Sequence, residues 1–255
     1  MFAEERRVKI VDIVNERRKV TVAQLCELLG VSSATIRMDL RELHRAGALT
    51  RTHGGAIQKV KTGFELNSRQ RVIQHLVEKQ QIAQAALMLI DDGDKIILDT
   101  GTTTVELANL LHNKSNLTVI TNDIEIASIL EDIDSLEVIV MGGILRKRFH
   151  CTINLQGRET YSGLTADKAF LGVNSLSLTK GAMTPDIRQA ETKKAMIEMA
   201  HRIILLCDSS KIDKVSFAQF ATTQQIDVII TDAIDKDLRS AFEEKGVEIL
   251  IAPRP

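Results

Sequence analysis

Residues 95–104 read KIILDTGTTT, a short apolar run followed by a small, hydroxyl-rich turn. The run Lys95–Leu98 is continuous and rich in isoleucine, which is typical of a strand buried on both faces of a parallel sheet. Residues 105–112, after the turn, have the apolar spacing of an amphipathic helix. This order predicts an α/β unit, and a glycine-containing turn at such a junction can hold a phosphate. Taken alone, the turn is equally typical of a tight reversal followed by a helix cap.

Six further apolar segments repeat this strand pattern along the chain, and amphipathic helices lie between most of them. The predicted strands cover residues 95–98, 117–120, 138–141, 169–173, 203–207, 228–230 and 247–251. The predicted helices cover residues 82–90, 105–112, 124–131 and 190–200. This alternation favours a mostly parallel sheet with helices on both faces. We therefore expect residues 79–255 to form one α/β domain.

The composition is that of a soluble globular protein. The 255 residues are 44% hydrophobic and 26% charged, and no apolar run approaches the roughly 20 residues that a membrane helix needs. The N-terminus lacks the apolar segment and cleavage site of a signal peptide. The three cysteines and six histidines are scattered, which predicts neither a disulfide framework nor a metal site. We expect a cytoplasmic protein with no membrane contact and no cofactor.

The first sixty residues differ in charge from the rest. They carry 11 lysines and arginines against 7 aspartates and glutamates, whereas the whole chain has a net charge of −1. A basic head on an acidic body suggests a polyanionic partner, although a solvated helix pair often carries the same excess. The chain has no tryptophan and one tyrosine. This scarcity argues against single-stranded nucleic acid, whose binding depends on aromatic stacking.

Residues 20–47 read VTVAQLCELLGVSSATIRMDLRELHRAG, which has the pattern of two helices joined by a short turn. Thr21 begins a capping box that a glutamine three residues later completes. The apolar face of the first helix consists of Ala23, Leu25, Leu28 and Leu29. Gly30 ends that helix, and Ser32 can cap the next one. This is helix-turn-helix geometry.

The second of these helices has the features of a DNA recognition helix. Its buried stripe is Ile36, Leu40 and Leu43, which leaves polar and basic side chains towards solvent near the helix start. A recognition helix presents these N-terminal residues to base edges in the major groove. Arg37 is the best candidate for a base contact, because arginine can pair bidentately with guanine. The alternative is a helical bundle with a solvated basic face.

A turn-rich piece, GALTRTHGGAI at residues 47–57, follows this helix. Residues 49–53 alternate between apolar and polar or basic, and Gly54 and Gly55 allow a tight reversal, so we expect a hairpin wing. Two basic side chains of the wing can clamp the DNA backbone or enter the minor groove. The predicted DNA-binding residues are Thr21, Ser32, Ser33, Thr35, Arg37, Met38, Arg41, Arg51 and His53.

These patterns divide the chain into two domains and a connecting segment. We expect a winged helix-turn-helix domain at residues 1–57, with an amphipathic helix at 4–18, and the α/β domain at 79–255. The polar, mixed segment 58–78 between them is predicted to be a linker that becomes helical towards its end.

Small polar residues follow most of the predicted strands. In an open parallel sheet, ligands bind in the crevice outside the carboxyl ends of the strands, so these residues form the candidate ligand site. Small residues let backbone amides approach an oxyanion, hydroxyls add donors, and lysines neutralise charge. The candidate ligand-binding residues are Asp99, Gly101, Thr102, Thr103, Thr121, Asn122, Gly142, Gly143, Lys180, Lys193, Asp208 and Lys211. Each alone is as well explained by a turn or a cap, but together they fit a sugar phosphate.

Residues 31–56, VSSATIRMDLRELHRAGALTRTHGGA, resemble the DNA-binding domain of DeoR-family bacterial transcriptional regulators, whose pattern is VS-x-x-TIRRDL-x-x-L-x-x-x-G-x-L-x-R-x-HGGA. Met38 departs from it where the family often has a second arginine, which suggests a shifted operator preference. The resemblance continues through KQQIAQAALMLIDDGDKIILDTGTTTVELANLL, VITND, MGGILRK, DKAFLGV and DSSK. It implies a repressor that binds double-stranded operator DNA. It also implies that a phosphorylated sugar controls this binding, through a C-terminal domain similar to ribose-phosphate isomerases.

The resemblance leaves an active isomerase with a fused DNA-binding domain as one alternative. The isomerases have an acidic pair after the strand that corresponds to AFLGV, and this chain has Asn174 and Ser175 there, while Glu191 and Lys180 match the isomerase pattern. We therefore expect binding without turnover. A non-specific DNA-packaging protein is the second alternative. Basic residues 146–150, RKRFH, can touch a phosphate or a neighbouring subunit, but we expect a solvated loop. Two-fold operators predict a homo-oligomer, dimer or tetramer.

Overall fold

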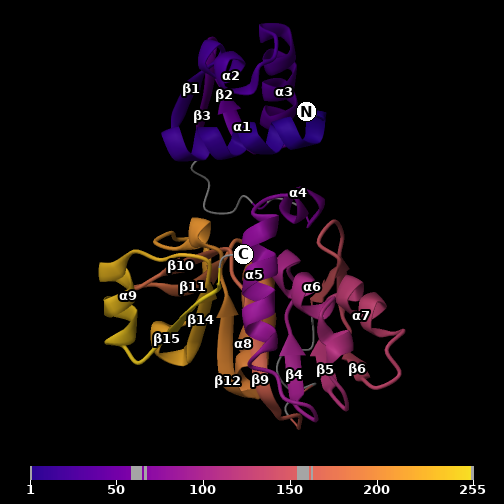
Figure 1. Cartoon of the computed structure of the whole chain (residues 1–255). Helices are drawn as coiled ribbons and strands as arrows, with labels where there is room; N and C mark the ends of the chain where they lie inside the picture. Colours follow the sequence, from indigo (N-terminus) through magenta and orange to yellow (C-terminus); the bar gives the residue numbers. More distant parts are fainter. Residues whose placement is uncertain (1, 59–64, 66–67, 154–160, 162, 254–255) are drawn as a thin grey trace. The chain divides into compact units, whose positions relative to one another are not determined.

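The computed structural model describes residues 2–58, 65, 68–153, 161 and 163–253 (Figure 1). The chain divides into two compact units, Met1–Gln74 and His75–Pro255. The predicted linker 58–78 lies partly outside the described residues, at 59–64 and 66–67. Its later part contains helix α4, Ser68–Val72. None of the described helices is long and apolar enough to span a membrane.

The first unit combines three helices with a small antiparallel sheet. In chain order its elements before α4 are α1 (Ala3–Arg17), β1 (Lys19–Thr21), α2 (Val22–Leu29), α3 (Ser33–Arg45), β2 (Leu49–Arg51) and β3 (Gly55–Gln58). Strands β2 and β3 form the predicted wing. The sequence did not predict β1, which pairs with β3 and gives the strand order β1-β3-β2.

The core of this unit is built mainly from α1 and α3. Ile36, Leu40 and Leu43 of α3 are buried, as their spacing predicts. The predicted apolar face of α2 is wrong in part, because only Leu25 is buried whereas Leu28 is about half exposed. Helix α2 has eight residues and ends at Gly30, whose left-handed φ of 66° favours glycine. A helix of two turns can bury few side chains against one neighbour.

Gly55 sets the distance between two strands of the wing sheet. A Cβ added at this position would lie 2.0 Å from the carbonyl oxygen of Val20, so no larger residue fits without a backbone shift. A Cβ at Gly54 would meet nothing within 4 Å. The second glycine of the pair is therefore required by close strand packing, whereas the first is not.

The second unit is built on a seven-stranded sheet in which every pair of strands is parallel. Its strands are β4 (Lys95–Leu98), β5 (Thr118–Thr121), β6 (Glu137–Val140), β9 (Ala166–Gly172), β12 (Ala200–Leu206), β14 (Val228–Thr231) and β15 (Glu248–Ile251). These are the seven predicted strands, with ends displaced by at most a few residues. The mostly parallel α/β fold is confirmed.

The strand order is β15-β14-β12-β9-β4-β5-β6. The first strand of the sheet in the chain is therefore the interior strand β4, from which the chain winds outward through β5 and β6 and then returns to the central strand β9 on the other side of β4. The direction of winding reverses between β4 and β9, which makes this the topological switch point where open α/β sheets bind ligands.

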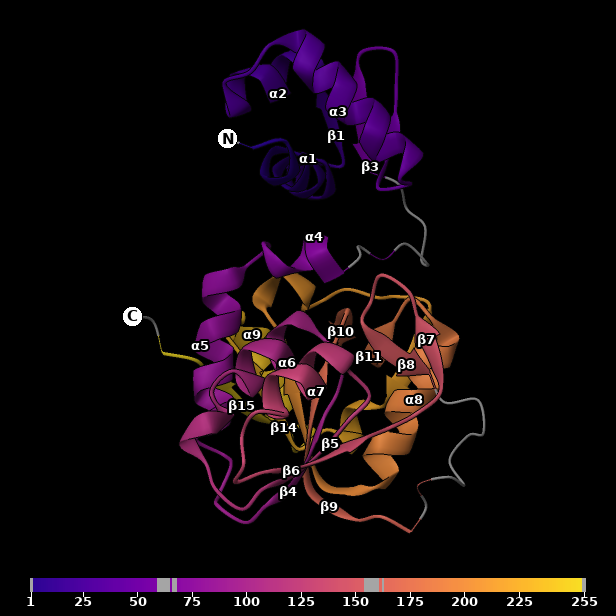
Figure 2. The ribbon, with the colours of Figure 1, turned by 90° about the vertical axis from the view of Figure 1, so that its right-hand side faces the viewer.

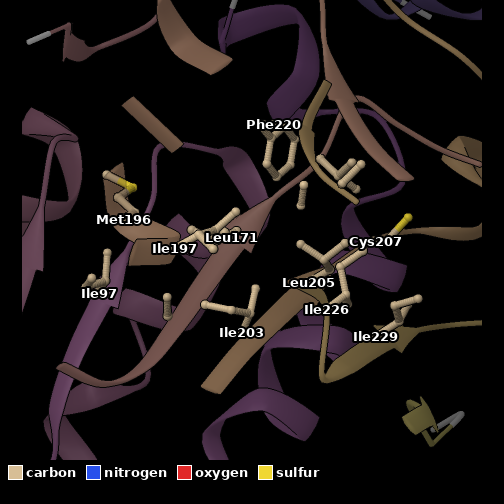
Figure 3. Close-up of a cluster of buried hydrophobic side chains, with 14 of the residues drawn as sticks. Ile97, Leu171, Met196, Ile197, Ile203, Leu205, Cys207, Phe220, Ile226 and Ile229 are labelled. Carbon is tan, nitrogen blue, oxygen red and sulfur yellow. The ribbon is translucent and has the colours of Figure 1, made fainter. Parts of the chain in front are cut away.

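Alternate residues of each strand pack into different cores on the two faces of the sheet. On β4, Ile96 and Leu98 face one cluster and Ile97 faces the other. Helices α5 (Leu76–Leu87), α6 (Thr102–Ala108) and α7 (Ile124–Leu130) cover the first face (Figure 2). Helices α8 (Ile187–Glu198) and α9 (Lys236–Glu243) cover the second, whose core includes Leu171, Leu205 and Phe220 (Figure 3).

Two smaller β-structures in this unit were not predicted. An antiparallel sheet has the order β10-β11-β13, made of Ser175–Ser177, Gly181–Thr184 and Ala218–Ala221. A hairpin consists of β7 (Ile144–Arg146) and β8 (Cys151–Ile153). The remaining elements are the 3-10 helices Leu111–Asn113, Ser209–Lys211 and Thr223–Gln225. Unlike most strands of the main sheet, these short strands contain no continuous run of three large apolar residues, so their pattern is too weak to be read from one sequence.

Candidate functional site

Helix α3 presents a basic, exposed face in the first unit. Ser33, Arg37 and Arg41 are spaced by four residues, so they share one face of the helix, and all three are exposed. Met38 lies beside them with 53% of its surface exposed. This face has the charge and the position that a recognition helix needs for a major-groove contact.

The predicted hydroxyl contacts have roles inside the protein. Thr21 forms the capping box of α2 with Gln24. Ser32 caps α3, because its Oγ accepts a hydrogen bond from the Thr35 amide at 3.3 Å and lies 2.9 Å from the Thr35 hydroxyl. These side chains fix the start of each helix and so orient the exposed face of α3.

An ion-pair cluster that the sequence did not predict anchors α3 to α1. Asp39 is fully buried, and its carboxylate accepts hydrogen bonds from Nε of Arg6 at 2.6 Å and from Nε of Arg7 at 3.0 Å. The hydrogen bond to Asp39 raises the pKa of Arg6, against the effect of burial. On the wing, Arg51 and His53 are exposed. Asp39 is therefore the structural partner of the basic residues of α1, which are not part of the exposed face.

In the second unit, a buried ion pair lies at the switch point of the sheet. Asp99 follows β4, and its Oδ2 accepts hydrogen bonds from Nζ of Lys193 and, at 3.0 Å, from the amide of Gly172. The ammonium of Lys193 also donates to the Gly172 carbonyl at 2.8 Å. Both side chains are buried. Burial raises the pKa of Asp99 more than the charge of Lys193 and the hydrogen bonds lower it.

The exit of β5 is joined to the exit of β4 through Asp123. Its Oδ2 accepts a hydrogen bond from the Thr100 hydroxyl at 2.6 Å, and its Oδ1 caps α7 through the Glu125 amide at 2.8 Å. Burial raises the pKa of Asp123, and these hydrogen bonds oppose the rise. Thr121 accepts from the Asp123 amide at 3.1 Å, and Asn122 donates to a backbone carbonyl of the β7–β8 hairpin at 3.0 Å.

Three buried polar atoms at these exits have no hydrogen-bond partner among the described residues. They are Oδ1 of Asp99, Oδ1 of Asn122 and Oγ of Ser175. They belong to segments that follow the neighbouring strands β4, β5 and β9. Buried polar groups are almost always paired, so each of these atoms needs a polar partner, which water or a ligand can supply.

A second polar cluster follows β12. Asp208 lies 2.9 Å from Nζ of Lys211 and accepts a hydrogen bond from Ser210. Burial opposes ionisation of Asp208, but the charge of Lys211 and the hydrogen bonds together lower its pKa to about 2. Ser209 binds Asp232, which follows β14, through its amide at 2.7 Å and its hydroxyl at 2.9 Å.

Comparison with known proteins places both units. A DeoR-like helix-turn-helix domain matches residues 6–62, and a DeoR C terminal sensor domain matches residues 74–233. The HTH-type transcriptional regulator GlpR of Haloferax volcanii is 36% identical over 98% of this chain and 98% of its own. The chain belongs to the DeoR family. The HTH-type transcriptional repressor GlcR of Bacillus subtilis is 35% identical over 98% of this chain and 97% of its own.

Among solved structures, ribose 5-phosphate isomerase A from Methanocaldococcus jannaschii is similar to 52% of this chain and 53% of its own, at 18% identity and a TM-score of 0.39. The sequence relatives are named as transcriptional regulators. The DeoR chain is therefore a DNA-binding transcriptional regulator and not an enzyme. Glu191, which matches the isomerase pattern, is exposed in this DeoR structure and pairs with Lys194 at 2.8 Å.

The DeoR structure does not bring all the predicted ligand residues into contact. Thr102 and Thr103 lie in the first turn of α6, and Gly101 precedes them. Lys180 is exposed in the turn between β10 and β11. Gly142 and Gly143 are exposed between β6 and β7, with the Gly142 amide donating to the Tyr161 hydroxyl at 2.8 Å. The buried centre of the site is therefore formed by the exits of β4, β5 and β9.

The predicted solvated loop RKRFH at 146–150 is wrong in part. Lys147 and Arg148 are exposed, but the side chain of Arg146 is only 12% exposed and lies 3.3 Å from Asp186. Thr100 and Cys151 were also missed as site residues. Their only sequence signal is their position beside residues that were predicted. In the described parts of this DeoR chain, no three His, Cys, Asp or Glu side chains are grouped to hold a metal ion.

Proposed function

We propose that this protein represses a carbohydrate-utilisation operon and that a phosphorylated sugar controls its binding to operator DNA. The observation that carries the proposal is the buried Asp99–Lys193 centre at the switch point, where Oδ1 of Asp99 has no described partner, together with the unpartnered atoms of Asn122 and Ser175 after the neighbouring strands. Such atoms suit the hydroxyl groups of a sugar, since a carboxylate and an amide carbonyl both accept hydrogen bonds. The name of the relative GlcR, a transcriptional repressor, supports the regulatory part.

The phosphate of this effector is expected beside the threonines that follow β4. Thr102 and Thr103 supply hydroxyl donors there, and Gly101 leaves the backbone accessible. Lys211 and Lys180 are the predicted additional cations, although Lys211 is paired with Asp208 in this structure. We expect these residues to bind, and not to convert, the sugar phosphate.

The first unit is proposed to read the operator through α3 and the wing. Arg37 and Arg41 are exposed on one face, which suits a base contact by the first and a phosphate contact by the second. Arg51 and His53 on the wing suit backbone or minor-groove contacts. A two-fold operator would require at least a dimer of the chain, and a dimer or tetramer is the proposed assembly in the cytoplasm.

A thermal-shift screen with phosphorylated and unphosphorylated sugars tests the effector. A ligand at about 100 times its dissociation constant stabilises the folded state by roughly 2.7 kcal/mol, if it does not bind the unfolded chain. We expect a rise in the unfolding midpoint with a phosphorylated pentose or hexose and none with the free sugar. If no phosphorylated sugar in the panel raises the midpoint, the proposed effector class is wrong.

Two variants separate DNA reading from effector sensing. Arg37→Ala should weaken a footprint on the operator and leave the effector-induced midpoint shift unchanged. Thr102→Val should leave the footprint intact and make operator release require more effector. A Thr102→Val protein that releases DNA at the wild-type effector concentration would show that the phosphate site is misplaced.

A further inference from the structure

The β7–β8 hairpin packs against the centre of the proposed effector site. Its second strand is hydrogen-bonded to the segment after β5, through the Thr152 amide to the Asn122 carbonyl at 2.9 Å and the Ile124 amide to the His150 carbonyl at 2.8 Å. The Thr100 hydroxyl, which binds Asp123, also lies 3.5 Å from a carbonyl of the hairpin.

Arg146 lies on the first strand of this hairpin. In the hairpin register it lies directly opposite Cys151, so the two side chains share one face. Cys151 is fully buried beside Thr100, and burial raises the pKa of its thiol to about 11. The charges of Arg146, Asp99 and Asp123 all act on this thiol. The charge of Arg146 therefore acts on the same buried thiol as the charges of the site's carboxylates.

The partners of Arg146 in this structure leave it able to exchange them. Its Nη1 donates to Gln189 at 3.0 Å, its Nε lies 3.3 Å from Asp186, and its guanidinium lies 3.6 Å above the Phe149 ring. Asp186 has a second arginine, Arg188, at 2.9 Å, and the hydrogen bond from Arg188 is the main cause that lowers the pKa of Asp186. Asp186 stays paired when Arg146 leaves.

The charge balance of the site requires one more cation for an anionic ligand. Lys193 is the buried cation at the strand exits, and Asp99 already neutralises it. Asp123 lies in the same cluster, so the described carboxylates there outnumber the buried ammonium groups. A phosphate group brings further negative charge, and an arginine fork suits it because it can donate two parallel hydrogen bonds.

We propose that Arg146 determines the specificity of the site for anionic effectors, by leaving Asp186 and pairing with the effector's phosphate group. This inference rests on the effector site proposed above. The exchange replaces a carboxylate partner by a phosphate partner, so the guanidinium stays neutralised throughout.

Titration of the full-length protein with inorganic phosphate tests this role, with the unfolding midpoint as the readout. A chloride salt keeps the ionic strength the same at every phosphate concentration. Arg146→Gln should raise the half-saturating phosphate concentration at least tenfold. Arg148→Gln is the matched control, because it removes an exposed arginine of the same loop and should behave as the wild type. Asp186→Asn should lower the half-saturating concentration about threefold, since it removes the competing charge while asparagine still caps α8.

A purely structural role for Arg146 gives a different pattern. Arg146→Gln and Asp186→Asn would then both lower the midpoint without phosphate, and neither would move the half-saturating concentration. That pattern overturns the inference. The inference is also overturned if phosphate raises the unfolding midpoint of the wild type no more than the midpoint of Arg146→Gln. Arg146→Lys keeps the charge without the fork, and it should bind phosphate with intermediate affinity if Arg146→Gln does not fold.

The phosphate titration measures anion binding, whereas the proposed function is tested by release of operator DNA, so each can fail without the other. If no sugar phosphate releases operator DNA but phosphate binding still depends on Arg146, the regulatory proposal fails and the anion site stands. If a sugar phosphate releases operator DNA equally from the wild type and from Arg146→Gln, the regulatory proposal stands and the role of Arg146 is wrong.

Discussion

The carboxylate of Asp99 is buried, and Lys193 is the cation that pairs with it. Burying two charges costs several kcal/mol for each ion, and their attraction offsets this cost only when both are present. A protein that needed only stability at this point could use two apolar residues of similar volume. The pair therefore supports the proposed ligand site at the switch point, as does the unpartnered oxygen of Asp99.

Lys193→Met should destabilise the second unit strongly, because it leaves Asp99 buried without its cation. We expect the free energy of unfolding to fall by about 3–5 kcal/mol. The double variant Asp99→Asn/Lys193→Met removes both charges and should lose clearly less. Urea unfolding at pH 7, followed by circular dichroism, measures both. Equal losses in the single and double variants would show that the lysine acts by packing and not by charge.

Asp208 predicts acid sensitivity with a definite sign. Its folded-state pKa of about 2 lies below its ordinary value of 3.8, so the ionised form stabilises the fold above the ordinary value. That contribution, about 2 kcal/mol, is lost as the pH falls from about 5 towards 2. The difference in free energy of unfolding between the wild type and Asp208→Asn should therefore shrink over this range. Asp134→Asn, which removes an exposed carboxylate, is the control.

At the scale of elements, the sequence predicted the strands and helix caps that depend on residues close together in the chain. The strand Lys95–Leu98 was predicted with its observed bounds, and the caps at Thr21 and Ser32 form as expected, because each depends on residues within one or two turns. The Asp99–Lys193 pair joins residues 94 positions apart, and no periodicity encodes it. The sequence predicted Asp99 from its place after a strand and Lys193 from its charge, whereas their contact comes from the packing of α8 on the sheet.

The short strands of the second unit also show where prediction from local sequence fails. In the β7–β8 hairpin Arg146 lies opposite Cys151 and pairs with Asp186, although the stretch RKRFH at 146–150 has the composition of a solvated loop. Lys180 has the chemistry of a phosphate ligand, yet it lies in an exposed turn of the antiparallel sheet. Residue type predicted what each side chain can bind, but tertiary packing of three-residue strands decides which of them reaches the site.

The wing sheet supplies a prediction with a matched pair of variants. Gly55→Ala puts a methyl group into the Val20 carbonyl and should separate β1 from β3, at a cost of at least about 1–3 kcal/mol. Gly54→Ala has open space around the added methyl group and should change little. Hydrogen exchange of residues 19–21 in the full-length protein should rise sharply in the first variant alone. Equal exchange in both would show that the β1–β3 contact is not essential.

At the scale of the whole molecule, the two units divide recognition by charge and by burial. The first unit offers exposed arginines on α3, as a polyanion requires, whereas the second unit buries the Asp99–Lys193 pair at the switch point of its sheet. An exposed basic face binds DNA at a strength that falls steeply with salt. A buried, neutralised centre is affected far less by salt, so the two binding events can be measured separately on one protein.

If effector and operator are coupled as proposed, the coupling must be reciprocal. A coupling free energy of about 1–3 kcal/mol changes the operator affinity by roughly 5- to 150-fold when the effector is saturating. The operator must then change the effector affinity by the same factor, in the same direction. We expect operator titrations with and without the sugar phosphate, and effector titrations with and without operator DNA, to give one common factor. A factor of one in both would mean that the second unit does not control DNA binding, however tightly it binds its ligand. Arg37→Ala should weaken operator binding by the same ratio with and without the sugar phosphate, and so leave the coupling factor unchanged. The side chain of Arg37 is exposed on α3 and takes part in only one of the two binding events.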